Sequence, residues 1–154
     1  MFRFILILLF FISLISACRQ SELYEKRNVL PKSTWDLQKP VKGTIQVTDT
    51  LAYYNLFVCI RHTDAYAYNN IWVRLKMACG KDSLLDTRLD LSLGTDADGW
   101  EGSGMNDIWD VCKKIRGPFR LPKKGDYHYE LGQCMRENTL KGIMSAGIRM
   151  EKVK

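Results

Sequence analysis

Apolar and polar residues alternate in short runs along most of the chain. Period-two patterns cover residues 71–78, 85–93, 127–132 and 144–151, with turn-forming residues between them. Such alternation is typical of β-strands that bury one face. Many such strands at short spacing predict an all-β fold, a single antiparallel β-sandwich of jelly-roll or immunoglobulin-like type.

Two segments depart from strict alternation. Residues 54–60 are nearly all apolar, which predicts a central strand with Leu56, Val58 and Ile60 in the core. Residues 105–115 place apolar side chains at helical spacing, but they fit a twisted strand equally well. We favour the strand because the neighbouring segments are strands.

The N-terminus carries an export pattern. Arg3 precedes an apolar run over residues 4–15, shorter than the roughly 20 residues that a membrane-spanning helix needs. Small residues and Cys18 follow, as at the cleavage site of a secretory signal peptide, and the segment resembles the lipobox of bacterial lipoproteins. We therefore expect a signal peptide over residues 1–17 and a lipid on Cys18, which holds the protein to the membrane.

The rest of the chain divides into a tether and one domain. Residues 18–42 are polar, charged and interrupted by prolines, which predicts a short lipidated tether on which only Trp35 docks against the domain. The sandwich is expected over residues 43–154, long enough for one core. No acidic sorting signal follows Cys18, so we expect outer-membrane anchoring with the domain facing the periplasm.

The formal net charge of +6 comes from scattered lysine and arginine residues. No basic run has the length of a nucleic-acid-binding tail, and exported proteins rarely meet nucleic acid, so we expect no nucleic-acid partner. The charge fits a position near anionic lipid or envelope glycan, and it fits a solvated surface without a partner equally well.

Cysteine spacing leaves the disulfides open. Four cysteines follow Cys18, at positions 59, 79, 112 and 134. Export permits disulfides, and four cysteines allow three pairings. Their spacing, and that of the two histidines, does not match a zinc site.

Candidate chemistry concentrates in residues 94–104. Asp96, Asp98 and Glu101 around turn glycines are weak candidates for Ca²⁺ ligands, although turn chemistry explains the same residues. The four tryptophans fill the core or line a sugar- or peptide-binding face. We assign Trp72 to the core and leave Trp100 open. No nucleophile, phosphate-loop or dinucleotide motif appears, so we expect no enzyme activity and no cofactor.

Two C-terminal stretches, residues 121–136 and 140–152, are the most distinctive part of the chain. They resemble the C-terminal half of the gliding-motility lipoprotein GldH family of Bacteroidetes, and the likeness extends over about residues 53–152. The resemblance implies a non-enzymatic envelope lipoprotein that binds other envelope proteins. The alternative is a glycan-binding sandwich module of the envelope.

Within these stretches we separate structural from docking residues. Gln133 is expected to bind loop backbone, Gly142 to make a turn, and Leu140 and Ile143 to fill the core. Arg136 is open between such a corner and partner docking, since arginine is favoured at interfaces. Trp100 is the second docking candidate.

Overall fold

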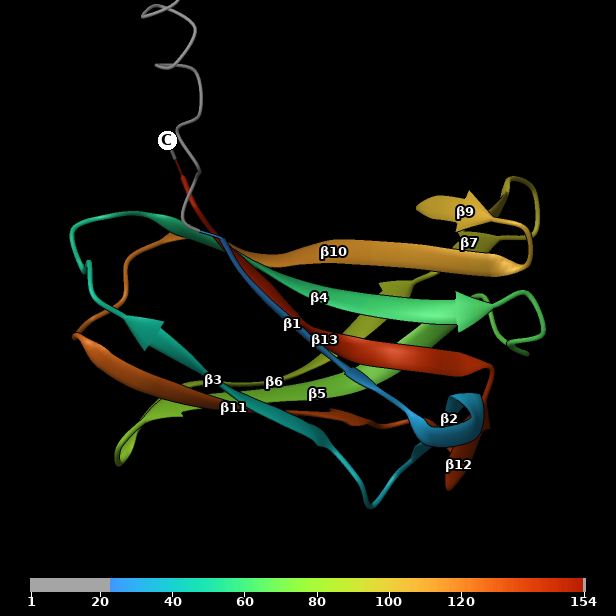
Figure 1. Ribbon diagram of the computed structural model, residues 1–154, viewed down its shortest axis with the longest axis horizontal. Coiled ribbons are helices and arrows are strands. Elements are labelled where there is room, and N and C mark those ends of the chain that lie inside the picture. The colour runs from blue at the N-terminus through green and yellow to red at the C-terminus, as the bar shows by residue number, and fades with distance from the viewer. Residues whose placement is uncertain (1–22, 154) are drawn as a thin grey trace, which may run out of the picture.

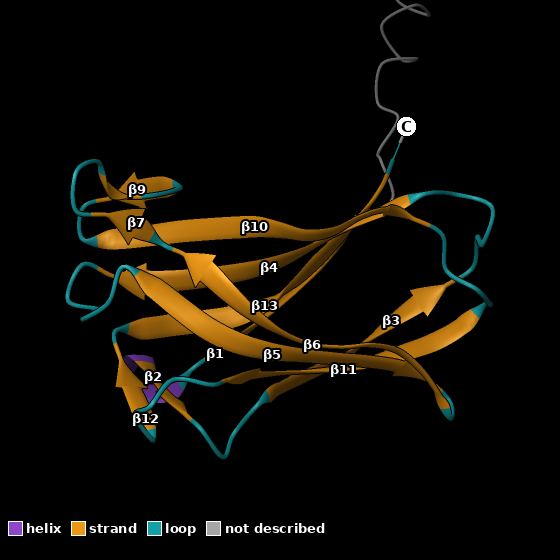
Figure 2. Ribbon diagram, turned by 180° about the vertical axis from the view of Figure 1, so that it is seen from behind, coloured by secondary structure: helices purple, strands orange, loops and turns teal. Residues whose placement is uncertain are grey.

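The computed structural model describes residues 23–153, which form two antiparallel β-sheets packed face to face (Figure 1). The first sheet has the strand order β1-β13-β4-β10-β9, and the second has the order β3-β11-β5-β6. Two small two-stranded sheets, β2–β12 and β7–β8, lie at one end (Figure 2). The prediction of an all-β, antiparallel sandwich is confirmed.

The strands of the five-stranded sheet are β1 (Leu23–Val29), β13 (Ile143–Lys152), β4 (Tyr54–Thr63), β10 (Ile108–Phe119) and β9 (Ser103–Met105). Those of the four-stranded sheet are β3 (Val41–Val47), β11 (Gly125–Gln133), β5 (Asn70–Cys79) and β6 (Asp82–Ser92). The remaining elements are η2 (Pro31–Ser33), β2 (Thr34–Asp36), β12 (Thr139–Lys141), β7 (Gly94–Thr95) and β8 (Gly99–Trp100). Within residues 23–153, no helix has the length and apolar character needed to cross a membrane.

The core lies between the two sheets and follows the predicted alternation. On β4, Leu56, Val58 and Ile60 are almost completely buried, as expected for a central strand between β13 and β10. On β5, every second residue from Ile71 to Met77 is buried. The ambiguous segment at 105–115 is a strand, as predicted: β10 pairs with β9 through a tight turn in which Asn106 has φ 56°.

The predicted tether is too long. Residues 23–29 form β1, an edge strand paired along its length with β13, and Trp35 is fully buried in β2. The boundary predicted at residue 43 is therefore wrong, because residues 23–42 belong to the sandwich. Alternation does not predict this strand, because Lys26 and Asn28 share the inward side with Tyr24, so β1 lacks an apolar stripe. The predicted signal peptide over 1–17 and the lipidation site Cys18 lie outside the described residues.

A glycine on β13 lets β1 come close. A Cβ atom built on Gly147 would lie 2.0 Å from the carbonyl oxygen of Lys26, so no larger residue fits while β1 is in place. One disulfide joins the neighbouring strands β4 and β10 at directly paired positions, Cys59 and Cys112. Cys79 and Cys134 are free. Each of the three possible pairings would join the four cysteines in two disulfides, and none of them is formed.

The strands run between two ends with different loops. The basal end, at the left of Figure 1, holds the start of β1, the end of β13 and the loops 48–53, 80–81 and 120–124. The apical end, at the right, holds the loops 64–69 and 134–138, the segment 93–107 and the small sheets. The sandwich therefore separates its N-terminus from its longest loops.

Candidate functional site

Aromatic side chains from three segments meet at the apical end. The His62 ring, at the end of β4, lies 4.6 Å from the Trp100 ring in an edge contact and 5.9 Å from the Tyr66 ring, centroid to centroid. Tyr66 in turn contacts Tyr68, with 5.7 Å between ring centroids. The alternation of β4 points His62 inward, and the loops after β4 and β6 bring the other rings over it.

His62 is buried, and its surroundings disfavour the charged imidazolium form. Its Nδ1 lies 2.9 Å from the carbonyl oxygen of Thr63, and its Nε2 has no hydrogen-bond partner within residues 23–153. Burial lowers the pKa of His62 below its ordinary value, against the opposing effects of the Thr63 carbonyl and the Asp110 charge. The apical end therefore contains, beneath its aromatic surface, an imidazole whose neutral form is favoured.

Two of the three calcium candidates, Asp98 and Glu101, are engaged by their own chain. Glu101 accepts hydrogen bonds from the Ser92 hydroxyl and the Lys113 ammonium group, and these hold the pKa of Glu101 below its ordinary value. Asp98 accepts a hydrogen bond from Thr95 Oγ1 at 3.0 Å within a tight turn. Over the described range, no three His, Cys, Asp or Glu side chains are grouped closely enough to hold a metal ion. The geometry thus fits the turn interpretation of these acids better than the calcium interpretation.

A shallow pocket of about 240 Å³ opens between the loop 64–69 and the segment 93–107. Its lining includes Tyr66, Tyr68, Asp96 and Trp100. Trp100 is half-buried, so part of its ring faces the pocket while its edge packs on His62. The structure brings two of the predicted site residues, Asp96 and Trp100, into one hollow with aromatic walls and a carboxylate.

The corner formed by residues 133–143 has the predicted structural roles. Gln133 is buried, donates from Nε2 to the carbonyl oxygen of Glu137 at 2.9 Å, and accepts from the Met135 amide at 2.8 Å. Gly142 has φ 85°, a left-handed conformation that glycine adopts without strain, and Leu140 and Ile143 are fully buried. The structural interpretation of these four residues is confirmed.

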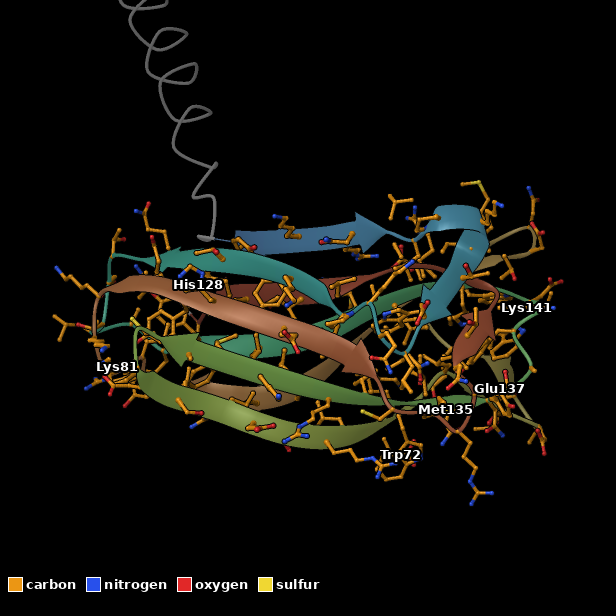
Figure 3. The ribbon with its side chains drawn as sticks, turned by 90° about the horizontal axis from the view of Figure 1, so that it is seen from below. Trp72, Lys81, His128, Met135, Glu137 and Lys141 are labelled. Carbon is orange, nitrogen blue, oxygen red and sulfur yellow. A yellow bond between two sulfur atoms is a disulfide. The ribbon has the colours of Figure 1, made fainter. Side chains whose placement is uncertain are left out.

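Arg136 differs from the buried residues of this corner. Its side chain is exposed in the loop 134–138 and does not line the aromatic pocket. Its neighbour Met135 contacts Trp72 at the apical end, and both are labelled in Figure 3. Tyr68 donates a hydrogen bond to the Glu137 carboxylate, which joins this loop to the aromatic cluster.

Trp72 is not a core residue. It lies on the outward face of β5, half-buried, with the Arg88 guanidinium 4.7 Å from its ring centroid. The backbone amide of Trp72 also contacts the Met135 sulfur at 3.2 Å. The inward positions on either side of it, Ile71 and Val73, fill the core instead. Strict alternation already placed Trp72 opposite those residues, so its hydrophobic size was the misleading signal.

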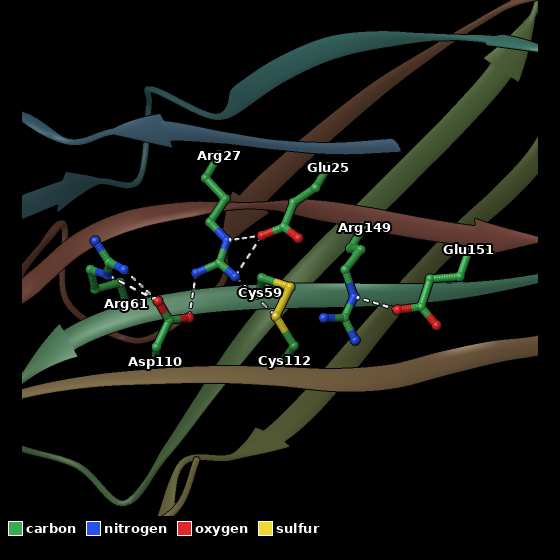
Figure 4. Close-up of polar contacts among 8 residues, drawn as sticks. All are labelled: Glu25, Arg27, Cys59, Arg61, Asp110, Cys112, Arg149 and Glu151. Atoms are coloured by element: carbon green, nitrogen blue, oxygen red, sulfur yellow. Dashed lines mark hydrogen bonds and ion pairs between the residues drawn. A yellow bond between two sulfur atoms is a disulfide. The ribbon is translucent and has the colours of Figure 1, made fainter. Parts of the chain in front are cut away.

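Sequence reasoning missed a charge cluster on the outward face of the five-stranded sheet. Arg27 on β1 and Arg61 on β4 both donate to the carboxylate of Asp110 on β10 (Figure 4). Arg27 also pairs with Glu25 and lies 3.3 Å from the Cys112 sulfur. No local sequence signal joins these residues, because the sheet brings together strands that are 83 residues apart.

Asp110 is ionised throughout the ordinary pH range. Burial raises its pKa, but the hydrogen bonds from Arg27 and Arg61 and their positive charges outweigh that effect and lower the pKa below its ordinary value. The Asp110 carboxylate on β10 thus links β1 to β4 and β10, the two strands that follow β13 in the sheet. The cluster fastens β1 to the sandwich.

A hollow of about 530 Å³ lies on the outward face of the four-stranded sheet. Charges of both signs line it, including Lys42, Lys76, Glu130 and Asp86. Several are matched: Lys42 Nζ lies 2.9 Å from Glu130 Oε2, and Asp86 pairs with Arg74. Paired charges on an open sheet face are typical of a solvated surface.

The comparisons with known proteins agree with one another. A family model described as GldH lipoprotein matches residues 22–150. A protein named gliding motility lipoprotein GldH homolog, from Christiangramia forsetii, is 23% identical over 155 residues, which cover 96% of this chain and 94% of that protein. Gliding motility lipoprotein GldH from Flavobacterium johnsoniae is 24% identical over 153 residues, which cover 95% of this chain and 94% of the relative. No solved structure matches the chain significantly.

Proposed function

Because this chain belongs to the GldH lipoprotein family, we propose that it is a lipid-anchored, non-enzymatic component of the cell-envelope machinery of gliding, and that it binds other envelope proteins through its apical end. The relatives from Christiangramia forsetii and Flavobacterium johnsoniae are named as gliding motility lipoproteins and align along nearly their whole length. The full-length alignment supports a common role for the whole domain.

One observation carries the assignment of the docking end. The chain enters the sandwich at the basal end, while Arg136, Trp100 and the segment 93–107 lie at the opposite end. An anchor at Cys18 holds the basal end at the membrane, so the apical end is the part that reaches other proteins. Its exposed arginine and aromatic residues are of the types favoured at protein interfaces.

The lipid anchor is tested by Cys18→Ser. This substitution removes the thiol that carries the lipid, so the protein is expected to remain unprocessed or to be mislocalised. Mass spectrometry of the N-terminal peptide and membrane fractionation give the readout. A serine variant that is still processed and lipid-labelled would contradict the anchor. Protease added to intact cells tests on which side of the outer membrane the domain lies. The domain is expected to be protected, since we place it in the periplasm.

The docking end is tested by Arg136→Ala, with Arg116→Ala on β10 as the matched control. Both replace an exposed arginine. After mild crosslinking in membranes, Arg136→Ala is expected to reduce the recovered envelope partners while Arg116→Ala leaves them unchanged, and thermal stability is expected to be unaffected in both. Equal recovery of partners from both variants would contradict apical docking through Arg136.

A second function, glycan binding, is favoured by the apical pocket alone. Tyr68 and Trp100 offer ring surface for the apolar faces of sugars, and Asp96 offers a hydrogen-bond acceptor for hydroxyl groups. Trp100→Ala is then expected to abolish retention on immobilised envelope glycan, whereas Trp72→Ala, a half-buried tryptophan outside the pocket, retains it. Wild-type protein that does not bind glycan excludes this alternative.

A further inference from the structure

The basal end presents a small apolar surface to solvent. Leu51, Tyr53 and Val153 are 79%, 47% and 37% exposed, and they surround a shallow hollow together with Pro118. Over residues 24–153, five large apolar side chains have such exposure, and these are three of them. Clustered exposure of this kind marks an interaction site, unlike single exposed apolar residues.

This surface is built on a fixed turn. The Asp49 carboxylate accepts hydrogen bonds from the backbone amides of Leu51 at 2.9 Å and Ala52 at 3.2 Å. The Val153 amide donates to the carbonyl oxygen of Tyr53 at 2.7 Å, which ties the end of β13 to the same loop. The apolar side chains are therefore held outward by backbone hydrogen bonds.

Two basic residues border the apolar surface. The Arg120 guanidinium lies 4.6 Å from the centroid of the Tyr53 ring, and Lys152 pairs with Asp49 at 2.8 Å. The loop 120–124 contains three basic residues, including Lys123 and Lys124, and no acidic one. An amphipathic tyrosine with basic neighbours suits the boundary between lipid headgroups and acyl chains.

The position of the chain start indicates which partner covers the apolar surface. β1 begins at the basal end, and Cys18 precedes Leu23 by five residues, which span at most about 18 Å when fully extended. A lipid on Cys18 therefore keeps the basal end within that distance of the bilayer. A membrane is the one partner that the anchor itself brings to this surface.

We propose that the basal end docks on the bilayer that holds the lipid anchor. Leu51, Tyr53 and Val153 enter the headgroup region, and the basic residues of the loop 120–124 contact anionic headgroups. This inference rests on the proposed anchor at Cys18. It orients the domain, with its strands rising from the membrane and its apical end pointing away.

The test places a new tryptophan at each end of the full-length lipidated protein. Leu51→Trp replaces an exposed apolar residue at the basal end, and Met105→Trp replaces a 75% exposed residue at the apical end as the matched control. Each variant is inserted into preformed phosphatidylcholine–phosphatidylglycerol vesicles whose acyl chains are brominated. The emission added by each tryptophan is obtained by subtracting the wild-type signal.

The added emission of Leu51→Trp is expected to be mostly lost in brominated vesicles, and that of Met105→Trp to be retained. Lys124→Glu in the Leu51→Trp background is expected to reduce the quenching, whereas Lys141→Glu at the apical end leaves it unchanged. Equal quenching at both ends, or none at position 51, overturns the docking. Mass spectrometry of the same sample separates the two proposals: an unlipidated Cys18 overturns the anchor and the docking together, whereas a lipidated Cys18 without quenching overturns the docking alone.

Discussion

The basal and apical ends are built on the same strands and have opposite chemistry. The basal loop 120–124 has three basic residues and no acidic one, whereas the apical segment 93–107 has four acidic residues and no basic one. Exposed aliphatic and tyrosine side chains mark the basal end, while a histidine and three other aromatic rings pack together at the apical end. The sandwich lets two surfaces diverge because its core lies between them.

This difference fits the proposed roles of the two ends, membrane docking at one and partner docking at the other. Loops carry function while the scaffold positions them, and here the scaffold keeps the two sets of loops at opposite ends of strands of about ten residues. Changes in the shared core should disturb both ends, whereas changes near one end should leave the other intact.

The largest effect is expected where the two ends share a core. Val58→Asp buries an unpaired charge at a fully buried position of β4 and should cost on the order of 5 kcal/mol, comparable to the whole stability of a small domain. Val29→Asp, at an 84% exposed valine of β1, is the control. Chemical denaturation gives the readout, and a folded Val58→Asp domain would show that the ends do not depend on this core.

The second largest effect is expected from a substitution that displaces β1, the strand that follows the proposed anchor. Gly147→Ala brings a methyl group against the Lys26 carbonyl and should cost about 2 kcal/mol by displacing β1. Gly132→Ala, whose Cβ would meet Pro40 at an ordinary 3.5 Å, should change stability by less than about 0.5 kcal/mol. Hydrogen exchange is expected to rise in residues 24–29 of Gly147→Ala. Protection there equal to that of the wild type would refute the close-contact argument.

A smaller effect is expected from the charge cluster that fastens β1. The folded-state pKa of Asp110 is lowered, so its carboxylate stabilises the fold above its ordinary pKa of 3.8, and that contribution is lost as the pH falls below this value. Asp110→Asn should therefore cost about 1 kcal/mol at neutral pH, because the site is partly screened by solvent, and should weaken the loss of stability in acid. Asp86→Asn, in an exposed pair with Arg74, should change stability less. Denaturation midpoints across the acid range test both variants.

The smallest effect concerns the apical end alone. Burial lowers the folded-state pKa of His62, so the unfolded chain takes up the proton first and stability falls as the pH drops below 6.5. His62→Gln removes this contribution, and His128→Gln, at an exposed histidine of β11, controls for the loss of a histidine. Thermal unfolding above and below pH 6.5 is expected to show a smaller pH-dependent fall in His62→Gln than in the control. The same fall in both variants would rule out His62 as its source.

The sequence predicted the strands that bury one apolar face. The core positions Leu56, Val58 and Ile60 are confirmed, because a nearly all-apolar segment fits a central strand. Turn chemistry predicted the roles of Gln133 and Gly142, which are also confirmed. The sequence did not predict elements whose structure depends on residues far away along the chain. β1 looks like a tether because its inward side carries Lys26 and Asn28, and only the distant partners Asp110 and Gly147 explain why it pairs.

The candidate site was predicted only in part, for the same reason. Trp100 and Asp96 were found from one loop, but their pocket also needs Tyr66 and Tyr68 from another. His62 looks like any polar residue at the end of a strand, and no spacing rule predicts that aromatic rings will cover it. Contacts between loops that belong to different strands depend on strand order, which alternation does not reveal.

The pairing of β1 with β13 also has a mechanical consequence. Tension applied through the chain start acts on Leu23 along the strand axis, and seven residue pairs resist it together, because antiparallel hydrogen bonds run perpendicular to the strands. Tension directed sideways would open the same pairs one after another. A load transmitted from the apical end to the membrane, in line with the strands, therefore acts in shear, the direction in which this edge strand is hardest to pull out.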